Sequence, residues 1–155
     1  MRIELVRAAL SDAQKIWQMQ VKAFARLLEI YQDVDTNPGS EPIDKVTMRL
    51  KQPFTYYYLI RVESEDVGAI RVIDKKEEGK NKRISPLFIL PEYQGKGYAQ
   101  QAMLEAERIH GGGHWELDTI LQEKGNCALY EKMGYRQTGR TKQLNERMTL
   151  VFYEK

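Results

Sequence analysis

The sequence has little cysteine, no long apolar run and almost no net charge. Its single cysteine, Cys127, excludes an internal disulfide and favours a reducing compartment. The longest apolar runs, such as residues 87–90, fall far short of the ~20 residues of a membrane-spanning helix. Charge at Arg2 and Glu4 interrupts any secretory signal, and a net charge of +2 lacks the basic excess of nucleic-acid-binding proteins. We therefore expect a cytoplasmic protein without membrane or nucleic-acid partners.

The composition that remains is that of an ordinary folded protein. Of 155 residues, 42% are hydrophobic and 30% are charged, which is typical of a globular chain and too apolar for a disordered one. A chain of this length usually forms one domain and buries roughly 70% of the surface that is exposed on unfolding. The sequence thus predicts one domain over residues 1–155.

Hydrophobic periodicity predicts alternating blocks of strand and helix. Helical spacing of apolar residues follows Ser11, which together with Gln14 matches a capping box, whereas β-branched and aromatic runs between charged turns indicate strands. The order implies a mixed sheet covered by helices, in an α/β or α+β layered domain. The expected strands are residues 3–7, 55–62, 67–73, 84–90, 115–120, 135–139 and 147–153, and the expected helices are 11–31, 41–50, 97–110 and 126–133.

The third of the central β-rich segments contains a proline. Pro86 cannot donate a ladder hydrogen bond, so the strand over residues 84–90 should carry a bulge or an interruption in its pairing. This strand, the helix after it and the strand over residues 115–120 form a crossover unit.

The most informative stretch is the strand-to-helix junction at residues 87–99. Gly95 and Gly97 allow a tight turn in which several N–H groups point at one spot, and the new helix adds its own unpaired N–H groups and positive dipole end. Such a junction suits a phosphate or pyrophosphate, although a plain turn explains it equally well. Two familiar phosphate motifs are excluded: Gln100 replaces the third glycine of a dinucleotide fingerprint, and Leu90 replaces the first glycine of a Walker loop.

Two motifs resemble the signatures of one family. The stretch from Gln94 to Ala99 (QGKGYA) is similar to the acyl-CoA signature of the GNAT superfamily of N-acetyltransferases, and the stretch from Asn126 to Tyr135 (NCALYEKMGY) is similar to its second signature. The order of elements agrees over essentially the whole chain. The resemblance implies the acyl-CoA N-acyltransferase fold, a mixed and mostly antiparallel sheet of about seven strands with about four helices. Its splayed strands four and five would be residues 84–90 and 115–120.

Carried over residue by residue, the resemblance also implies how acetyl-CoA is held. Backbone groups of Leu87, Phe88 and Ile89 would pair with the pantetheine arm, and the N–H of Ile89 or a neighbour would polarise the thioester carbonyl. The motif and the first turn of its helix would hold the pyrophosphate through Gln94, Gly95, Lys96, Gly97, Tyr98, Ala99 and Gln100.

The same resemblance implies the catalytic residues. Tyr130 would protonate the departing thiolate, although a tyrosine on a short helix is also a common core aromatic. A base is needed because an ammonium has no lone pair; Asp118 is the candidate, with a strand-end aspartate and a water chain as alternatives. Where several relatives carry a CoA-contacting asparagine, this sequence has Glu123. Asn126 is the nearest asparagine, and helix N-cap is its simpler role.

Other signals are weaker. His110 and His114 flank three glycines and lack a third ligand for a metal, and Cys127 is interpreted as a small core residue. The acceptor cleft should involve the connection between the first two helices. The candidates for that cleft are Tyr31, Asp33, Asp35, Glu41, Trp115 and residues 56–58, which alternatively only pack or face solvent.

These observations predict a single N-acetyltransferase domain that needs no metal. It would move the acetyl group of acetyl-CoA to a primary amine of a small molecule or peptide, by direct attack in a ternary complex. The alternatives are an acyl-CoA-binding sensor without turnover, or a loop that binds another phosphate ligand such as a nucleotide. The segment 147–153 either pairs across a homodimer or completes a monomer.

Overall fold

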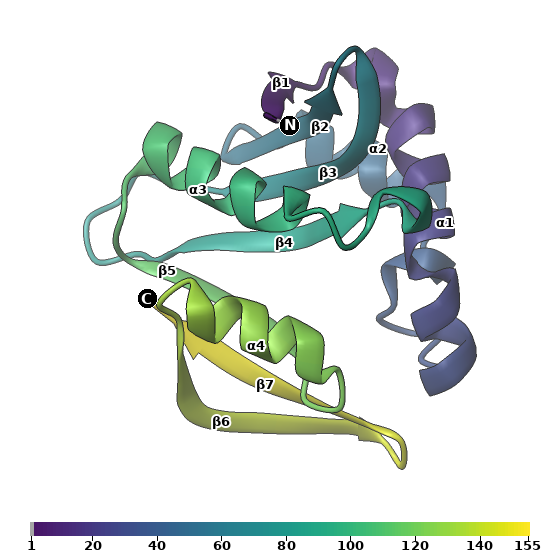
Figure 1. Cartoon of the computed structure of the whole chain (residues 1–155), viewed down its shortest axis with the longest axis vertical. Coiled ribbons are helices and arrows are strands. Elements are labelled where there is room, and N and C mark those ends of the chain that lie inside the picture. The colour runs from purple at the N-terminus through teal and green to yellow at the C-terminus, as the bar shows by residue number, and fades with distance from the viewer. Residues whose placement is uncertain (1) are drawn as a thin grey trace.

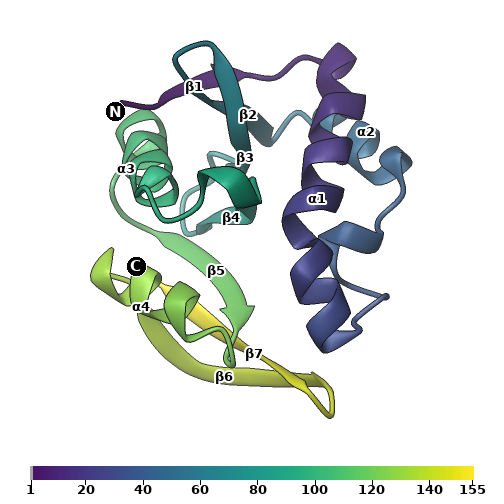
Figure 2. The ribbon, with the colours of Figure 1, turned by 45° about the vertical axis from the view of Figure 1, so that its right-hand side comes forward.

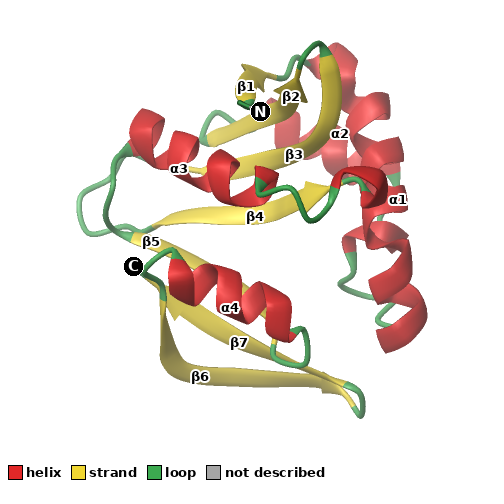
Figure 3. Cartoon of the chain, viewed as in Figure 1, coloured by secondary structure: helices red, strands yellow, loops and turns green. Residues whose placement is uncertain are grey.

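The computed structural model describes residues 2–155 and follows the predicted order of elements (Figures 1 and 3). Three short 3₁₀ turns, η1 (Leu10–Asp12), η2 (Pro38–Ser40) and η3 (Pro91–Tyr93), join the main elements. The helices are α1 (Ala13–Tyr31), α2 (Ile43–Lys51), α3 (Tyr98–His110) and α4 (Lys124–Lys132). The strands are β1 (Glu4–Arg7), β2 (Thr55–Val62), β3 (Glu65–Ile73), β4 (Lys82–Ile89), β5 (Trp115–Ile120), β6 (Arg136–Asn145) and β7 (Met148–Glu154).

All strands join one seven-stranded sheet, in the order β1-β2-β3-β4-β5-β7-β6. Every neighbouring pair is antiparallel except β4 and β5, which run parallel. The parallel pairing is confined to Lys82 opposite Trp115 and Arg83 opposite Glu116. Beyond these pairs β4 and β5 diverge, and the separation is visible in Figure 2. The mixed sheet and its splayed fourth and fifth strands are thus confirmed.

Helices cover both faces of the sheet, so a hydrophobic core lies on each face. Successive side chains of β2 point alternately into these two cores. Tyr57 and Leu59 pack in the core beneath α1 and α2, whereas Tyr58 and Ile60 belong to the core that contains Met103 of α3. The helix α4 lies over β5 and β7 (Figure 1). Among the helices of residues 2–155, none combines the length and apolar character needed to cross a bilayer.

The predicted interruption at Pro86 is present in β4. Ile70 lies opposite Leu87 and Val72 lies opposite Ile84, so Ser85 and Pro86 face a single residue of β3. The Ser85–Pro86 peptide bond is cis. The bulge redirects β4 just after its last contact with β5, where the two strands diverge.

Two predicted helix starts are wrong. The helix α1 begins at Ala13 after the turn η1, and the side chain of Asp12 accepts the N–H of Ala9 at 2.8 Å, so the capping residue is not Ser11. The helix α4 begins at Lys124, because the N–H of Asn126 is already bonded to the carbonyl of Glu123 at 3.1 Å. Asn126 is therefore inside the first turn and is not the N-cap.

The sequence leaves open whether the segment 147–153 pairs across a homodimer or completes a monomer. The strand β7 is bonded to β5 on one edge and to β6 on the other, so it has no open edge for pairing across a dimer. The outer strand of this half of the sheet is β6.

One close backbone approach makes β3 sensitive to substitution. Gly68 faces Ile89, and a Cβ atom at Gly68 would lie 2.1 Å from the carbonyl oxygen of Phe88. We expect Gly68→Ala to separate β3 from β4 and to lower the free energy of unfolding by about 2 kcal/mol, measured by urea denaturation. Gly112→Ala is the control, since no atom lies within 4 Å of its added methyl group. Equal unfolding midpoints for the two variants would contradict the predicted strain.

Candidate active site

Two adjoining cavities occupy the space where β4 and β5 diverge. One, of about 520 Å³, lies between the end of β4, the glycine loop and the start of α4; we call it the donor cavity. The other, of about 330 Å³, lies between α1, η2, β5 and β7; we call it the acceptor cavity. The two are adjacent, because both are lined by Phe24, Leu27, Leu87, Asn126 and Tyr130.

The end of β4 presents backbone groups to the donor cavity. The N–H of Leu90 donates to the carbonyl of Val67 in the β3 direction at 2.8 Å. Because successive residues of a strand point their N–H groups to opposite edges, the N–H of Ile89 points away from β3 and toward the splay. The carbonyl of Ile89 on that edge accepts the side-chain amide of Gln94 at 3.0 Å. This hydrogen bond ties the glycine loop to the strand.

The glycine loop ends in a helix N-terminus that faces the donor cavity. Gly95 and Gly97 have φ angles of 79° and 80°, a left-handed conformation that costs glycine little and other residues more. The helix α3 begins directly after Gly97, so the first N–H groups of its backbone have no acceptor within the helix. Together with the helix dipole, these groups form a site that favours an anion.

Tyr130 lies where the donor and acceptor cavities adjoin. It belongs to α4, and its ring centroid is 6.2 Å from those of both Tyr135 and Tyr153. Burial raises the pKa of Tyr130 to about 12, and the negative charge of Asp118 adds to the shift. The phenol is therefore protonated throughout the ordinary pH range and can act as a proton donor.

Asp118 lines the acceptor cavity but is not a solitary carboxylate. It lies on β5, two residues beyond the last pairing with β4, and forms an ion pair with Arg83, the last paired residue of β4. About a quarter of each side chain is exposed, 24% for Asp118 and 29% for Arg83, so water reaches the pair. Arg83 is not among the site residues that the sequence predicts.

Glu123 bridges α1 and α4 at the edge of the donor cavity. Its carboxylate accepts hydrogen bonds from Arg26 and from the hydroxyl of Tyr31, both at 2.6 Å. These partners lower the pKa of Glu123 against the opposing effect of its burial. Glu123 is therefore hydrogen-bonded to α1, at the position where several members of the family that the sequence resembles carry an asparagine.

The structure brings most of the residues predicted from the sequence together. Lys96 is the exception, because it is not among the lining residues and its amine lies 5.9 Å from the ring centroid of Tyr93. Asp118 lines only the acceptor cavity. The predicted residues that line the donor cavity are Leu87, Phe88, Ile89, Gln94, Gly95, Gly97, Tyr98, Ala99, Gln100, Asn126 and Tyr130.

One of the proposed acceptor-site residues lines the acceptor cavity, and the others lie elsewhere. Asp33 lines the acceptor cavity, where it accepts the backbone N–H of Thr36 at 3.2 Å. Trp115 and Tyr57 are fully buried in the cores and do not line the cleft. Tyr56 and Tyr58 line a third cavity, Tyr31 contacts Glu123, Asp35 is exposed, and Glu41 forms an ion pair with Arg49.

Histidine and cysteine are used in packing and hydrogen bonding. His110 contacts Tyr58 and Asp74. Within residues 2–155 no three His, Cys, Asp or Glu side chains are arranged to hold a metal ion. Cys127 is buried, with its Sγ 3.8 Å from the carbonyl oxygen of Ile120.

Three of the solved structures that share this architecture are acetyltransferases. A spermidine N-acetyltransferase from Vibrio cholerae, in complex with CoA and spermine, has a TM-score of 0.75 at 13% identity, with 98% of this chain and 94% of that chain covered. The acetyltransferase from Salmonella typhimurium that modifies the N-terminal serine of ribosomal protein L7/L12 has a TM-score of 0.72 at 15% identity, covering 99% and 94%. An acetyltransferase from Thermus thermophilus has a TM-score of 0.70 at 17% identity, covering 99% and 96%. At these identities, the likeness shows the fold.

The family follows from the sequence itself. A family model described as an acetyltransferase (GNAT) domain matches residues 53–137, more than half of the chain. None of the curated protein sequences compared with the chain matches it significantly. The chain belongs to the GNAT acetyltransferases, as its two motifs predicted.

Proposed function

We propose that this protein transfers the acetyl group of acetyl-CoA to a primary amine by direct attack in a ternary complex. The observation that carries the proposal is the meeting of the donor and acceptor cavities at Tyr130. An anion-favouring helix terminus and an open strand edge line the donor cavity, and two carboxylates line the acceptor cavity. That arrangement provides for both reactants of an acetyl transfer and for a proton donor between them.

The donor cavity fits the chemistry of acetyl-CoA. A Cβ atom at Gly95 or Gly97 would meet no atom within 4 Å, so space beside the loop is available to a pyrophosphate. The edge of β4 at Leu87 and Ile89 offers backbone donors and acceptors to the amides of a pantetheine arm. The co-substrate supplies the activated acetyl group as a thioester. The chain supplies the groups that bind, orient and protonate it.

The chain's own residues account for the electron and proton movements. The N–H of Ile89 would donate to the thioester carbonyl oxygen and stabilise the charge that grows there. As the amine nitrogen bonds to the carbonyl carbon and the C–S bond breaks, Tyr130 would give its proton to the departing sulfur. Asp118 would take a proton from the amine. An acyl-cysteine route is disfavoured, because Cys127 is buried in the core.

Asp118 gives the proposal a pH signature. An aliphatic amine has a pKa near ~10.4, so a base is most needed at neutral pH and least needed when the amine is already free. We expect Asp118→Asn to lower kcat about 100-fold at pH 7 and by a smaller factor above pH 9, measured as thiol release. Glu116→Gln on the same strand is the control. A loss of the same size at every pH would assign Asp118 a structural role.

The acceptor is proposed at the level of an amine-bearing small molecule or peptide. Apolar side chains from α1, β5 and β7 line much of the acceptor cavity, while Asp33 supplies negative charge that favours a cation and Asp118 is paired with Arg83. The related structures include one enzyme with bound spermine and one that modifies an N-terminal serine. Both acceptor classes therefore belong in the first screen.

The deciding experiment is calorimetric titration with acetyl-CoA, followed by thiol-release assays on polyamines, amino acids and short peptides. We expect micromolar binding that CoA displaces and adenine nucleotides do not, with thiol release on at least one amine. Binding without release on any amine would favour the acyl-CoA sensor. Displacement by ATP would favour a nucleotide site, and no binding at millimolar acetyl-CoA would refute the proposal.

A further inference from the structure

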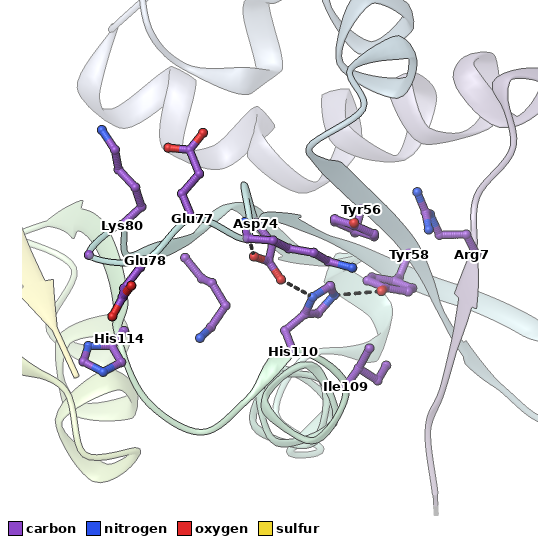
Figure 4. A pocket seen from close by; sticks show the side chains of 13 residues that line it. Arg7, Tyr56, Tyr58, Asp74, Glu77, Glu78, Lys80, Ile109, His110 and His114 are labelled. Atoms are coloured by element: carbon purple, nitrogen blue, oxygen red, sulfur yellow. Dashed lines mark hydrogen bonds and ion pairs between the residues drawn. The ribbon is translucent and has the colours of Figure 1, made fainter.

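A third cavity lies at the opposite end of α3 from the glycine loop. It has a volume of about 730 Å³ and is formed by the ends of β1, β2 and β3, the following loop and the C-terminus of α3 (Figure 4). It shares no lining residue with the donor or acceptor cavity. The 13 residues of α3 separate it from the glycine loop by about 20 Å, at a rise of ~1.5 Å per residue. We call it the distal cavity.

The inner wall of the distal cavity is a hydrogen-bonded relay. The hydroxyl of Tyr58 and Nε2 of His110 are 2.8 Å apart, and Nδ1 of His110 is 2.9 Å from Oδ2 of Asp74. The side chains of His110 and Asp74 are only 4% and 9% exposed. Burial lowers the pKa of His110, so the neutral ring can donate to Asp74 and accept from Tyr58. Both carboxylate oxygens of Asp74 are hydrogen-bonded, Oδ2 to His110 and Oδ1 to the backbone N–H of Lys76.

Two cations beside this wall lack a carboxylate partner. The guanidinium carbon of Arg7 lies 4.6 Å from the ring centroid of Tyr56, and the amine of Lys76 lies 5.4 Å from the same centroid. Neither residue forms an ion pair within residues 2–155; Arg7 has only the carbonyl of Thr55 at 3.3 Å. An anion in the cavity would supply the negative charge that each of these cations lacks among residues 2–155.

The backbone holds Lys76 in this position. Lys76 has a φ angle of 54°, which is unusual for a residue with a side chain, and its N–H donates to Oδ1 of Asp74 at 3.0 Å. The side chain of the neighbouring Glu77 points away from Tyr56, and that of Glu78 lies toward His114 (Figure 4). The local fold thus places a cation at Tyr56 and keeps the nearest loop carboxylates aside.

We propose that the distal cavity binds a small oxyanion, a carboxylate or phosphate group of a metabolite, through Arg7 and Lys76. The face of Tyr56 and the neutral wall of Tyr58 and His110 would contact the remainder of the ligand. This site is distinct from the substrate cavities, since it shares no lining residue with either and lies at the opposite end of α3 from the glycine loop.

The test is titration of the full chain with citrate and, separately, with inorganic phosphate, at low ionic strength and with saturating CoA. The chain has two histidines, His110 and His114, and both line the distal cavity. We therefore expect saturable shifts of the histidine NMR signals and a heat of binding in calorimetry. Arg7→Gln and Lys76→Gln should each weaken the affinity at least about tenfold, which corresponds to roughly 1.4 kcal/mol.

Lys75→Gln is the matched control, because it removes the same charge from the adjacent residue, whose amine lies 5.1 Å from the ring centroid of Phe54. We expect it to bind citrate like the unmodified chain. An equal loss in Lys75→Gln would reduce the effect to general surface charge and overturn the proposal. Absence of saturable histidine shifts with both anions, or displacement of CoA by them, would also overturn it. Retained acetyl-CoA binding in all variants shows that they are folded.

Discussion

Gly97→Glu is expected to weaken acetyl-CoA binding at least about 100-fold while leaving the protein folded. Gly97 precedes the first turn of α3, where the unpaired N–H groups favour an anion. A carboxylate placed there competes for those groups and repels the pyrophosphate, and two unit charges ~4 Å apart repel by roughly 4 kcal/mol near a protein surface. Calorimetric titration with acetyl-CoA measures the loss directly.

Two further variants separate charge from backbone strain. Gly97→Ala imposes the cost of a side chain at a φ angle of 80° without adding charge, so it should retain most of the affinity. Gly139→Glu adds the same charge on β6 at a φ angle of 91°, again in open space and away from the cleft. If Gly97→Ala were as damaging as Gly97→Glu, the conformation of the loop and not its charge preference would explain the loss.

Tyr130→Phe is expected to lower kcat about 100-fold with little change in the dissociation constant of acetyl-CoA. The substitution removes the hydroxyl proton that Tyr130 would give to the departing sulfur in the proposed mechanism, and it preserves the ring packing against Tyr135 and Tyr153. With its pKa at about 12, Tyr130 stays protonated below that pH. The unmodified enzyme should therefore show no alkaline loss of kcat from this group up to about pH 11, measured as rates of thiol release.

Tyr135→Phe is the matched control for the phenol. It removes a buried hydroxyl that has no hydrogen-bond partner among residues 2–155, from a ring in contact with Tyr130. That variant should keep a normal kcat. A normal kcat in Tyr130→Phe, or an equal loss in Tyr135→Phe, would remove Tyr130 from the proton-transfer step.

The sequence was sufficient for the order of elements and the β4 bulge because each rests on a local rule. Pro86 cannot donate to a ladder, and Gly95 and Gly97 permit a tight turn wherever they occur. The starts of α1 and α4 were missed for a local reason as well. The short turn η1 precedes α1, and there Asp12 instead of Ser11 forms the capping hydrogen bond, with the N–H of Ala9. The helix α4 begins two residues before Asn126.

The parts of the site that were missed depend on long-range pairing. Arg83 and Asp118 are 35 residues apart, and Glu123 lies 97 residues from Arg26, so no spacing rule connects them. The sequence leaves open whether Trp115 and Tyr57 line the acceptor cleft or only pack. The faces on which the two side chains lie depend on sheet register and helix packing, which bury them completely.

The contact between the donor and acceptor cavities has a kinetic consequence. Each cavity has its own lining beyond the residues they share, with the glycine loop on one side and β7 on the other. Under the proposed function, the acetylated amine would be able to leave while spent CoA is still bound, because the two reactants would not share one binding position. Initial-rate plots against both substrates should give intersecting lines, and the parallel lines of a substituted-enzyme cycle should be absent.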